Sequence, residues 1–233
     1  MRWNVPDMWK DGECWIIGGG PSVPRMFGVP ESTIQDVYKK RQTIAAYSPY
    51  LSALHDKHII GVNTAYQLGN WVDIVLFGDV AFYLEHASRL LDFKNLKVCC
   101  HPRVQNGRPG VHHVKYLQQD RTKERGLTSR VGHVGWNKHS GAVAINLAYH
   151  LGVKRVYLLG FDMKLNADGK SHSHAEYHQE GLPKHRQRTP FSAHLVMYPH
   201  IAKDAQKLKL EIINVNDDSA ITQFPIVKLE DVL

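Results

Sequence analysis

Small and polar residues follow several apolar runs of the sequence, at the points where those runs end. A Gly-Gly-Gly-Pro-Ser turn at 18–22 follows the run 14–17, and Asn63 follows the run 58–62. A glycine-rich turn that enters a helix exposes backbone N–H groups, which suit a phosphate. Asn and Asp side chains add the donors and acceptors that select a base or a ribose. The pattern predicts a nucleotide site with these candidate residues: Gly18, Gly19, Gly20, Pro21, Ser22, Asn63, Asp79, Ser140, Gly141 and Asp162.

Each of these features also has an ordinary structural interpretation. A Gly-Gly-Gly turn is often only a tight turn, and Asp79 and Ser140 also suit helix caps. The turn is not the G-x-G-x-x-G dinucleotide motif, because Val23 stands where a glycine is required. It is not a Walker A loop, because no Gly-Lys-Ser/Thr follows it. The coincidence of five such segments at strand ends favours a binding site over unrelated turns.

The elements that would position these residues follow an α/β pattern. Short apolar runs alternate with helical patterns, which is typical of a largely parallel sheet. Ligands of open α/β sheets bind outside the carboxyl ends of the strands, where the polar segments should meet. We expect one Rossmann-like α/β domain over 1–233, with an insertion at 101–139 and a flexible lid at 164–189. The expected strands are 14–17, 58–62, 72–77, 96–100, 156–161 and 210–215, and the expected helices are 30–41, a short one from 48, 80–91, 140–151 and 190–207.

The composition excludes disordered and fibrous classes, because 43% of the 233 residues are hydrophobic and 22% are charged. The most apolar window, 141–163, is interrupted by His150, Lys154 and Arg155, so we expect no membrane span. The first residues lack the apolar core of a signal peptide. The three cysteines are interpreted as structural thiols of a reducing compartment. These observations predict a cytoplasmic protein, and they leave a homo-oligomer open.

Positive charge is concentrated in the insertion. The chain carries 29 Lys and Arg against 22 Asp and Glu, a net charge of +7. Residues 101–139 hold eight of the cations and two acids, and a second basic cluster lies at 184–188. Such charge suits an anionic small-molecule substrate. The alternatives are a nucleic-acid partner and a merely solvated surface.

Fifteen histidines are present, and three of them form an H-x-H-x₃-H pattern at His172, His174 and His178. Such a cluster suits a transition metal, but its spacing matches no familiar zinc motif. We interpret the segment as a polar lid and assign no metal ligand.

The order of the motifs resembles one superfamily. It contains the bacterial lipooligosaccharide sialyltransferases, motility-accessory-type proteins and an archaeal-type pterin diphosphokinase branch. The resemblance rests on G-G-G-P-S at 18–22, Asn63, Asp79, Ser140-Gly141 and L-L-G-F-D at 158–162, and it covers residues 14–215. One departure is Gly19, where the superfamily often has Asn near the phosphate or ribose.

The resemblance implies a nucleotide-dependent transferase, foremost a glycosyltransferase that uses a nucleotide-sugar donor, with a CMP-sugar favoured. It also implies that a histidine before the last large helix acts as general base. His185 fits that place best, and His194 is the reserve. One alternative is a Mg²⁺-dependent diphosphokinase of the pterin type, with Asp79 or Asp162 as a metal ligand. The other is a non-catalytic nucleotide- or nucleic-acid-binding module.

Overall fold

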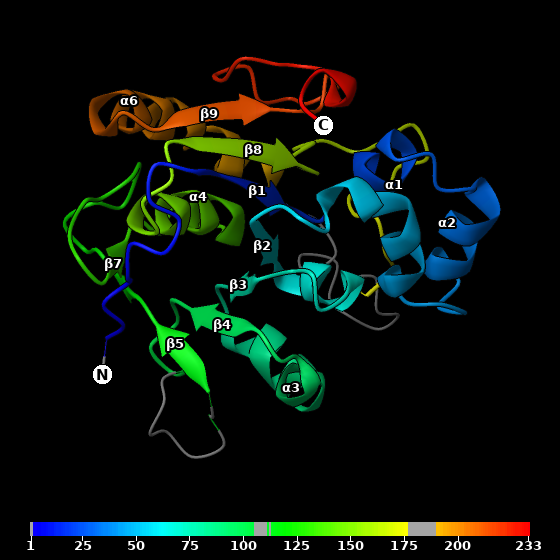
Figure 1. The fold of residues 1–233 in the computed structure, drawn as a ribbon, viewed down its shortest axis with the longest axis horizontal. Coiled ribbons are helices and arrows are strands. Elements are labelled where there is room, and N and C mark those ends of the chain that lie inside the picture. The colour runs from blue at the N-terminus through cyan, green and yellow to red at the C-terminus, as the bar shows by residue number, and fades with distance from the viewer. Residues whose placement is uncertain (1, 105–110, 112, 177–189) are drawn as a thin grey trace.

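Seven parallel strands form the central sheet of the computed structural model, which describes residues 2–104, 111, 113–176 and 190–233. The strand order is β5-β4-β3-β2-β1-β8-β9 (Figure 1). Trp15 of β1 lies between Ile59 of β2 and Tyr157 of β8 in the ladder. The α/β fold with a mostly parallel sheet is therefore confirmed. The strands are β1 (Glu13–Ile17), β2 (Ile59–Val62), β3 (Ile74–Phe77), β4 (Leu96–Cys99), β5 (Val114–Tyr116), β8 (Arg155–Leu159) and β9 (Glu211–Asn214).

Helices cover both faces of the sheet, which explains why its strands read as nearly continuous apolar runs. Ile16, Ile60 and Leu158 pack in one core with α4 and α6. Trp15, Ile59 and Leu159 point to the other face and pack in a second core. That face is covered by α1 (Ser22–Met26), α2 (Glu31–Tyr38), α3 (Val80–Asp92) and the 3₁₀ segments η1 (Ile44–Leu54) and η2 (Asn63–Leu68), while α4 spans Ser140–His150 and α6 spans Tyr198–Leu208.

The direction of the strand order changes beside β1. From β1 the chain adds β2, β3, β4 and β5 on one side, and it then crosses to place β8 and β9 on the other. Figure 1 shows β8 and β9 above β1, with β2 and β3 below it. The segments that leave β1 and β8 therefore diverge at a switch point, which is where open α/β sheets form a ligand crevice.

Two expected helices differ from the prediction. The helix expected over 190–207 is divided into α5 (Phe191–Leu195) and α6, with Pro199 in the first turn of α6. Proline lacks the N–H that a continuous helix needs, so it suits a helix start. The short helix expected from Ser48 is a 3₁₀ segment that begins earlier, at Ile44.

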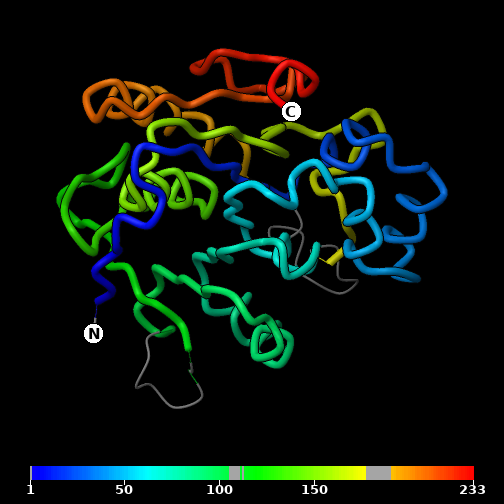
Figure 2. The backbone as a smooth tube through the Cα atoms, in the orientation of Figure 1, coloured from blue at the N-terminus to red at the C-terminus, as the bar shows by residue number. Residues whose placement is uncertain are grey.

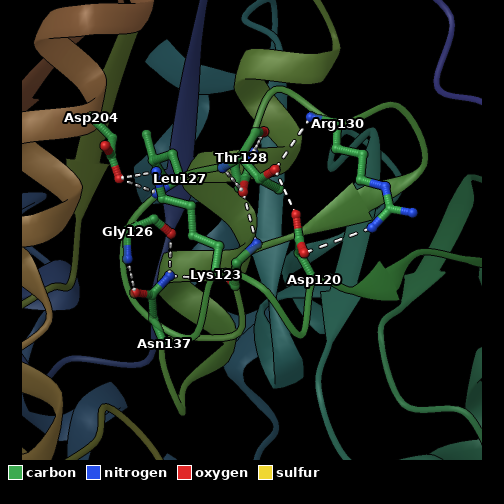
Figure 3. A network of polar contacts seen from close by, with 10 residues as sticks. Asp120, Lys123, Gly126, Leu127, Thr128, Arg130, Asn137 and Asp204 are labelled. Atoms are coloured by element: carbon green, nitrogen blue, oxygen red, sulfur yellow. Dashed lines mark hydrogen bonds and ion pairs between the residues drawn. The ribbon is translucent and has the colours of Figure 1, made fainter.

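The insertion 101–139 contributes regular structure instead of an aperiodic loop. It supplies β5, and β6 (Gln118–Gln119) pairs with β7 (His133–Val134) in a second small sheet. The Asn137 side chain accepts from the N–H of Gly126 at 2.6 Å and donates to its carbonyl at 2.8 Å (Figure 3). Asn146 of α4 does the same for Thr128 at 3.0 and 2.9 Å. The Asn137 amide thus ties two parts of the insertion together, and the Asn146 amide attaches the insertion to α4.

The C-terminal segment lies against the edge of the sheet. After β9 the chain turns back and runs beside that strand, where the N–H of Asn214 donates to the carbonyl of Pro225 (Figure 2).

Cys14, Cys99 and Cys100 are buried free thiols, and burial raises the pKa of the Cys100 thiol to about 12. Among the residues that the structure describes, no helix is both long and apolar enough to cross a membrane.

Candidate functional site

A cleft opens at the switch point, outside the carboxyl ends of β1, β2 and β8. It is lined by the glycine turn, the start of α4, the exit of β8 and part of the expected lid. Seven of the ten predicted binding residues lie in its wall. The lining residues are Gly18, Gly19, Gly20, Val62, Asn63, His139, Ser140, Gly141, Gly160, Phe161, Asp162, Met163, Ser171, His172, Phe191 and His194.

The glycine turn is pressed against the exit of β8. The N–H of Gly20 donates to the carbonyl of Gly160 at 2.9 Å, and a Cβ at Gly20 would stand 2.5 Å from that oxygen and overlap the Asp162 carboxylate. A Cβ at Gly18 would also stand 2.7 Å from the Gly160 oxygen. Glycine is therefore required here for the contact between two chain segments. A Gly20→Val side chain would meet the same atoms, so we expect this substitution to damage the fold as well as the cleft.

Asp162 holds the turn in place from β8. Its carboxylate accepts from the N–H of Ser22 at 3.3 Å and from the Asn216 side chain. Burial raises the pKa of Asp162, and the hydrogen bond from Ser22 opposes that effect. Both carboxylate oxygens of Asp162 thus accept from protein donors. These hydrogen bonds account for the residue by its role in holding the turn, without a contact to a ribose. Pro21 and Ser22 lie beside the cleft, in a neighbouring pocket that shares Asp162 as a wall.

Asn63 takes a strained backbone conformation at the end of β2. Its φ of +52° lies in the left-handed region, which Asn tolerates better than most residues. Its side-chain oxygen is buried and has no hydrogen-bond partner among the described residues. A buried polar atom without a partner costs stability unless a ligand or water satisfies it. Asn63 therefore lines the cleft and carries a side-chain acceptor that no described residue uses.

Asp79 lies at the same edge of the sheet but outside the cleft wall. It is exposed, and its carboxylate accepts from the N–H of Phe82 at 2.7 Å as the N-cap of α3. Its neighbour Gly78 lies close to Ser140, because a Cβ at Gly78 would stand 2.7 Å from the Ser140 hydroxyl. Asp79 and Asp162, either of which would be the metal ligand in the alternative Mg²⁺-dependent reaction, thus serve as a helix cap and a turn anchor.

His139, which the sequence analysis missed, caps α4 in place of Ser140. Its Nδ1 accepts from the N–H of Ala142 at 3.2 Å. Burial, together with the nearby His194, lowers the pKa of His139 to about 3. The ring is therefore neutral and carries its proton on Nε2, which is buried without a partner among the described residues. In the sequence, the one sign of this capping role is that His139 stands immediately before the start of a predicted helix.

Of the two candidate bases, the structure describes His194 and not His185. His194 of α5 lines the cleft, and its ring centroid lies 4.6 Å from that of His139. Burial lowers the pKa of His194, while its hydrogen bond with the backbone of Lys138 opposes the shift. His185 lies outside the described residues, as do His178 of the metal pattern and the basic cluster 184–188.

The segment 171–174, which we call the strap, closes the cleft over the glycine turn. The N–H of Ser173 donates to the carbonyl of Gly19 at 2.8 Å. The hydroxyls of Tyr38 and Tyr47 donate to the carbonyls of His172 and Ser173 at 2.6 and 2.8 Å. This part of the expected flexible lid is therefore fixed by hydrogen bonds.

His174 is used within the strap. Its Nε2 lies 2.8 Å from the Thr64 hydroxyl, and its Nδ1 accepts from the N–H of Glu176 at 3.2 Å. Both ring nitrogens thus have protein partners, which gives this member of the H-x-H pattern a structural role.

The cleft carries little formal charge. No Lys or Arg of the described ranges lines it. In the insertion, Lys123 pairs with Asp204 at 2.9 Å and Arg130 with Asp120 at 3.9 Å (Figure 3). Among the described residues, no Lys or Arg of the insertion lines this cleft, and a role of this charge toward an anionic substrate stays a prediction. An anion in the cleft would meet backbone N–H groups, the positive end of α4 and imidazoles instead.

Comparison with known proteins supports the fold. No family model matches the chain, and no curated protein matches it. The MAf glycosyltransferase from Magnetospirillum magneticum AMB-1 superposes on the whole chain with a TM-score of 0.57 and 14% identity. The chain spans 36% of the length of that protein. The likeness shows a shared Rossmann-like fold.

Two further structures resemble the chain more distantly. They are the sialyltransferase CstII from Campylobacter jejuni with cytidine-5'-monophosphate and with CMP-3FNeuAc. Each is 12% identical, and each match covers 92% of this chain and 84% of CstII. The TM-scores are 0.46 and 0.43.

Proposed function

We propose that the chain is a glycosyltransferase that binds a nucleotide-activated sugar in the cleft. The observation that carries the proposal is the convergence of the glycine turn, the Asn63 side-chain oxygen and the start of α4 at the switch point of the sheet. The glycosyltransferase fold shared with the MAf protein is consistent with it. The resemblance of the motifs adds the preference for a CMP-sugar.

The phosphate of the donor would lie between the glycine turn and the start of α4. Ser140 and Gly141 form the first turn of α4, whose N–H groups and dipole favour an anion. Asn63 would accept from a hydroxyl of the ribose or an amino group of the base. Because the described wall contains no Lys or Arg, these dipoles would stabilise the departing phosphate.

A histidine would remove the proton of the acceptor hydroxyl. The acceptor oxygen then bonds to the anomeric carbon, while the bond from that carbon to the phosphate oxygen breaks and the nucleotide leaves with the electron pair. His194 suits the base because it lines the cleft, and its lowered pKa keeps the ring neutral near pH 7. His185 is the second candidate for the same role.

Ligand binding tests the donor first. A thermal-shift screen against CMP, UMP, GMP, AMP and their sugar conjugates should raise Tm for one base family, because a ligand that binds only the folded state stabilises it. Asn63→Ala should reduce that shift. Asp79→Ala is the matched control at the same sheet edge, and it should lower Tm through the lost helix cap without reducing the ligand-induced shift. No shift with any of these compounds would contradict the proposal.

Turnover tests the base. His194→Ala should lower kcat by about 10²–10⁴-fold with little change in nucleotide affinity, because a base acts in the transition state. The same experiment on His185→Ala assigns the role to that residue if the loss of kcat falls there. A normal kcat in both variants would exclude His194 and His185 as the base.

A further inference from the structure

The imidazole of His172 is placed directly over the glycine turn. A Cβ at Gly19 would stand 2.8 Å from Cδ2 of His172 and 3.8 Å from its Nε2. The Cδ2 corner of the ring therefore faces the turn, with Nε2 as the next atom of the ring, and both residues line the cleft. Glycine at 19 makes room for a side chain that arrives from another part of the chain.

The ring is held in this place by contacts of the strap. The Ser171 hydroxyl lies 2.9 Å from Nδ1 of His172. The backbone carbonyls of His172 and of the next residue, Ser173, accept from the hydroxyls of Tyr38 and Tyr47. The N–H of Ser173 donates to the carbonyl of Gly19. The position of the imidazole is thus set by groups from α2, η1 and the turn itself.

Charged side chains are scarce in the described wall of the cleft. The described residues of the cleft include no Lys or Arg, and its only carboxylate, Asp162, is engaged by Ser22 and Asn216. Within the glycine turn, the N–H groups of Gly18, Gly20 and Ser22 already donate to protein acceptors, so a phosphate in the cleft would meet the N–H of Gly19 and the first N–H groups of α4. An N–H from the imidazole beside the turn would add a donor to this shell.

We propose that His172 is a binding residue of the cleft whose Nε2–H donates a hydrogen bond to the phosphate of a bound nucleotide. The inference rests on the proposed function and adds to it a residue of the strap. It assigns to Gly19 the role of leaving space for that imidazole.

Calorimetry with CMP and cytidine tests the inference at the phosphate. His172→Ala should raise the Kd for CMP by about tenfold, the effect of one lost hydrogen bond to a charged group. It should leave the Kd for cytidine, which lacks the phosphate, within about twofold of wild type. An equal loss for both ligands, or a loss for neither, would overturn the inference.

Two controls distinguish the effect of the imidazole on CMP binding from the effects of the strap and of the turn. Tyr38→Phe removes a hydrogen bond that holds the strap but keeps the ring, so it should weaken CMP binding less than His172→Ala does. Gly19→Ala should weaken CMP binding by displacing the ring, and it should have a much smaller effect when combined with His172→Ala. Additive effects in the double variant would contradict the proposed contact.

The two failures are distinguishable. If the wild-type chain binds none of the nucleotides, the proposed function fails and the inference fails with it. If wild type binds CMP and His172→Ala binds it equally well, the proposed function stands and only the role of His172 is lost.

Discussion

The two walls of the cleft are built by different means. The first wall consists of the turn 18–20, Asn63 and the start of α4, all of which follow or open elements of the sheet. The second wall is the strap, which belongs to no helix or strand of the described chain. Hydroxyl groups more than a hundred residues away in sequence, on Tyr38, Tyr47 and Thr64, hold it. The first wall is fixed by backbone packing, and the second by side-chain hydrogen bonds.

This difference predicts different responses to mutation. Backbone packing leaves no room for added atoms, so changes in the first wall should damage folding. Hydrogen bonds from single hydroxyls are worth about 1 kcal/mol each, so changes in the second wall should act on binding more than on stability.

The largest effect is expected at Gly20. Gly20→Ala places a methyl group against the Gly160 carbonyl and the Asp162 carboxylate, and we expect a loss of about 3 kcal/mol or more in the free energy of unfolding. Urea denaturation measures it. Gly19→Ala is the matched control, because its methyl meets only the ring of His172, which can move. Equal losses in the two variants would remove the distinction between the walls.

A second large effect is expected at His139 and depends on pH. Because folding lowers the pKa of His139 from its ordinary value to about 3, the neutral ring stabilises the fold above about pH 6.5. That contribution should be lost as the pH falls from about 6.5 toward 3. His139→Asn keeps a capping side chain without a titrating ring, so its stability should fall less steeply over the same range. Parallel pH profiles for the two proteins would contradict the buried neutral imidazole.

A smaller effect is expected at Tyr47. Tyr47→Phe leaves the buried Ser173 carbonyl without its donor, and we expect a loss of about 1–2 kcal/mol together with faster amide exchange at 171–174. Tyr198→Phe is the control, because the hydroxyl of Tyr198 is buried without a partner among the described residues. That variant should be neutral or more stable. Unchanged exchange in Tyr47→Phe would show that the strap does not depend on this hydroxyl.

The smallest effect is expected in the insertion. Arg121 and Arg125 are exposed and do not line the cleft. Reversal of either charge, in Arg121→Glu or Arg125→Glu, should change nucleotide affinity by less than about twofold at physiological salt, because exposed charges are screened. A tenfold loss that shrinks at high salt would restore the insertion as part of the binding surface.

The first wall could be predicted from the sequence because each of its parts obeys a local rule. An apolar run ending in Gly18 or Asn63 marks a strand end, and the carboxyl ends of parallel strands share one edge. The residue that caps α4 was misjudged, since His139 is an unusual cap and Ser140 is a common one. Capping propensity alone therefore does not decide which of two adjacent polar residues caps a helix.

The second wall could not be predicted in the same way. Nothing in the spacing of His172 and His174 reveals that one faces the glycine turn and the other bonds to Thr64. These contacts join residues distant in sequence, and they depend on side chains whose partners are known only once the fold is formed. For the same reason the positive charge of 101–139 suggested a substrate surface, whereas Lys123 and Arg130 form ion pairs within the structure.

The central claim is that the two walls together bind the phosphate of a nucleotide. Amide NMR titration of the ¹⁵N-labelled protein with CMP tests it most directly, because each backbone N–H reports its own surroundings. The account predicts saturable shifts at Gly19, Gly20, Ser140, Gly141 and His172, with little change at Arg121 and Arg125. Shifts confined to the insertion, or no saturable shift at the glycine turn and the start of α4, would contradict it.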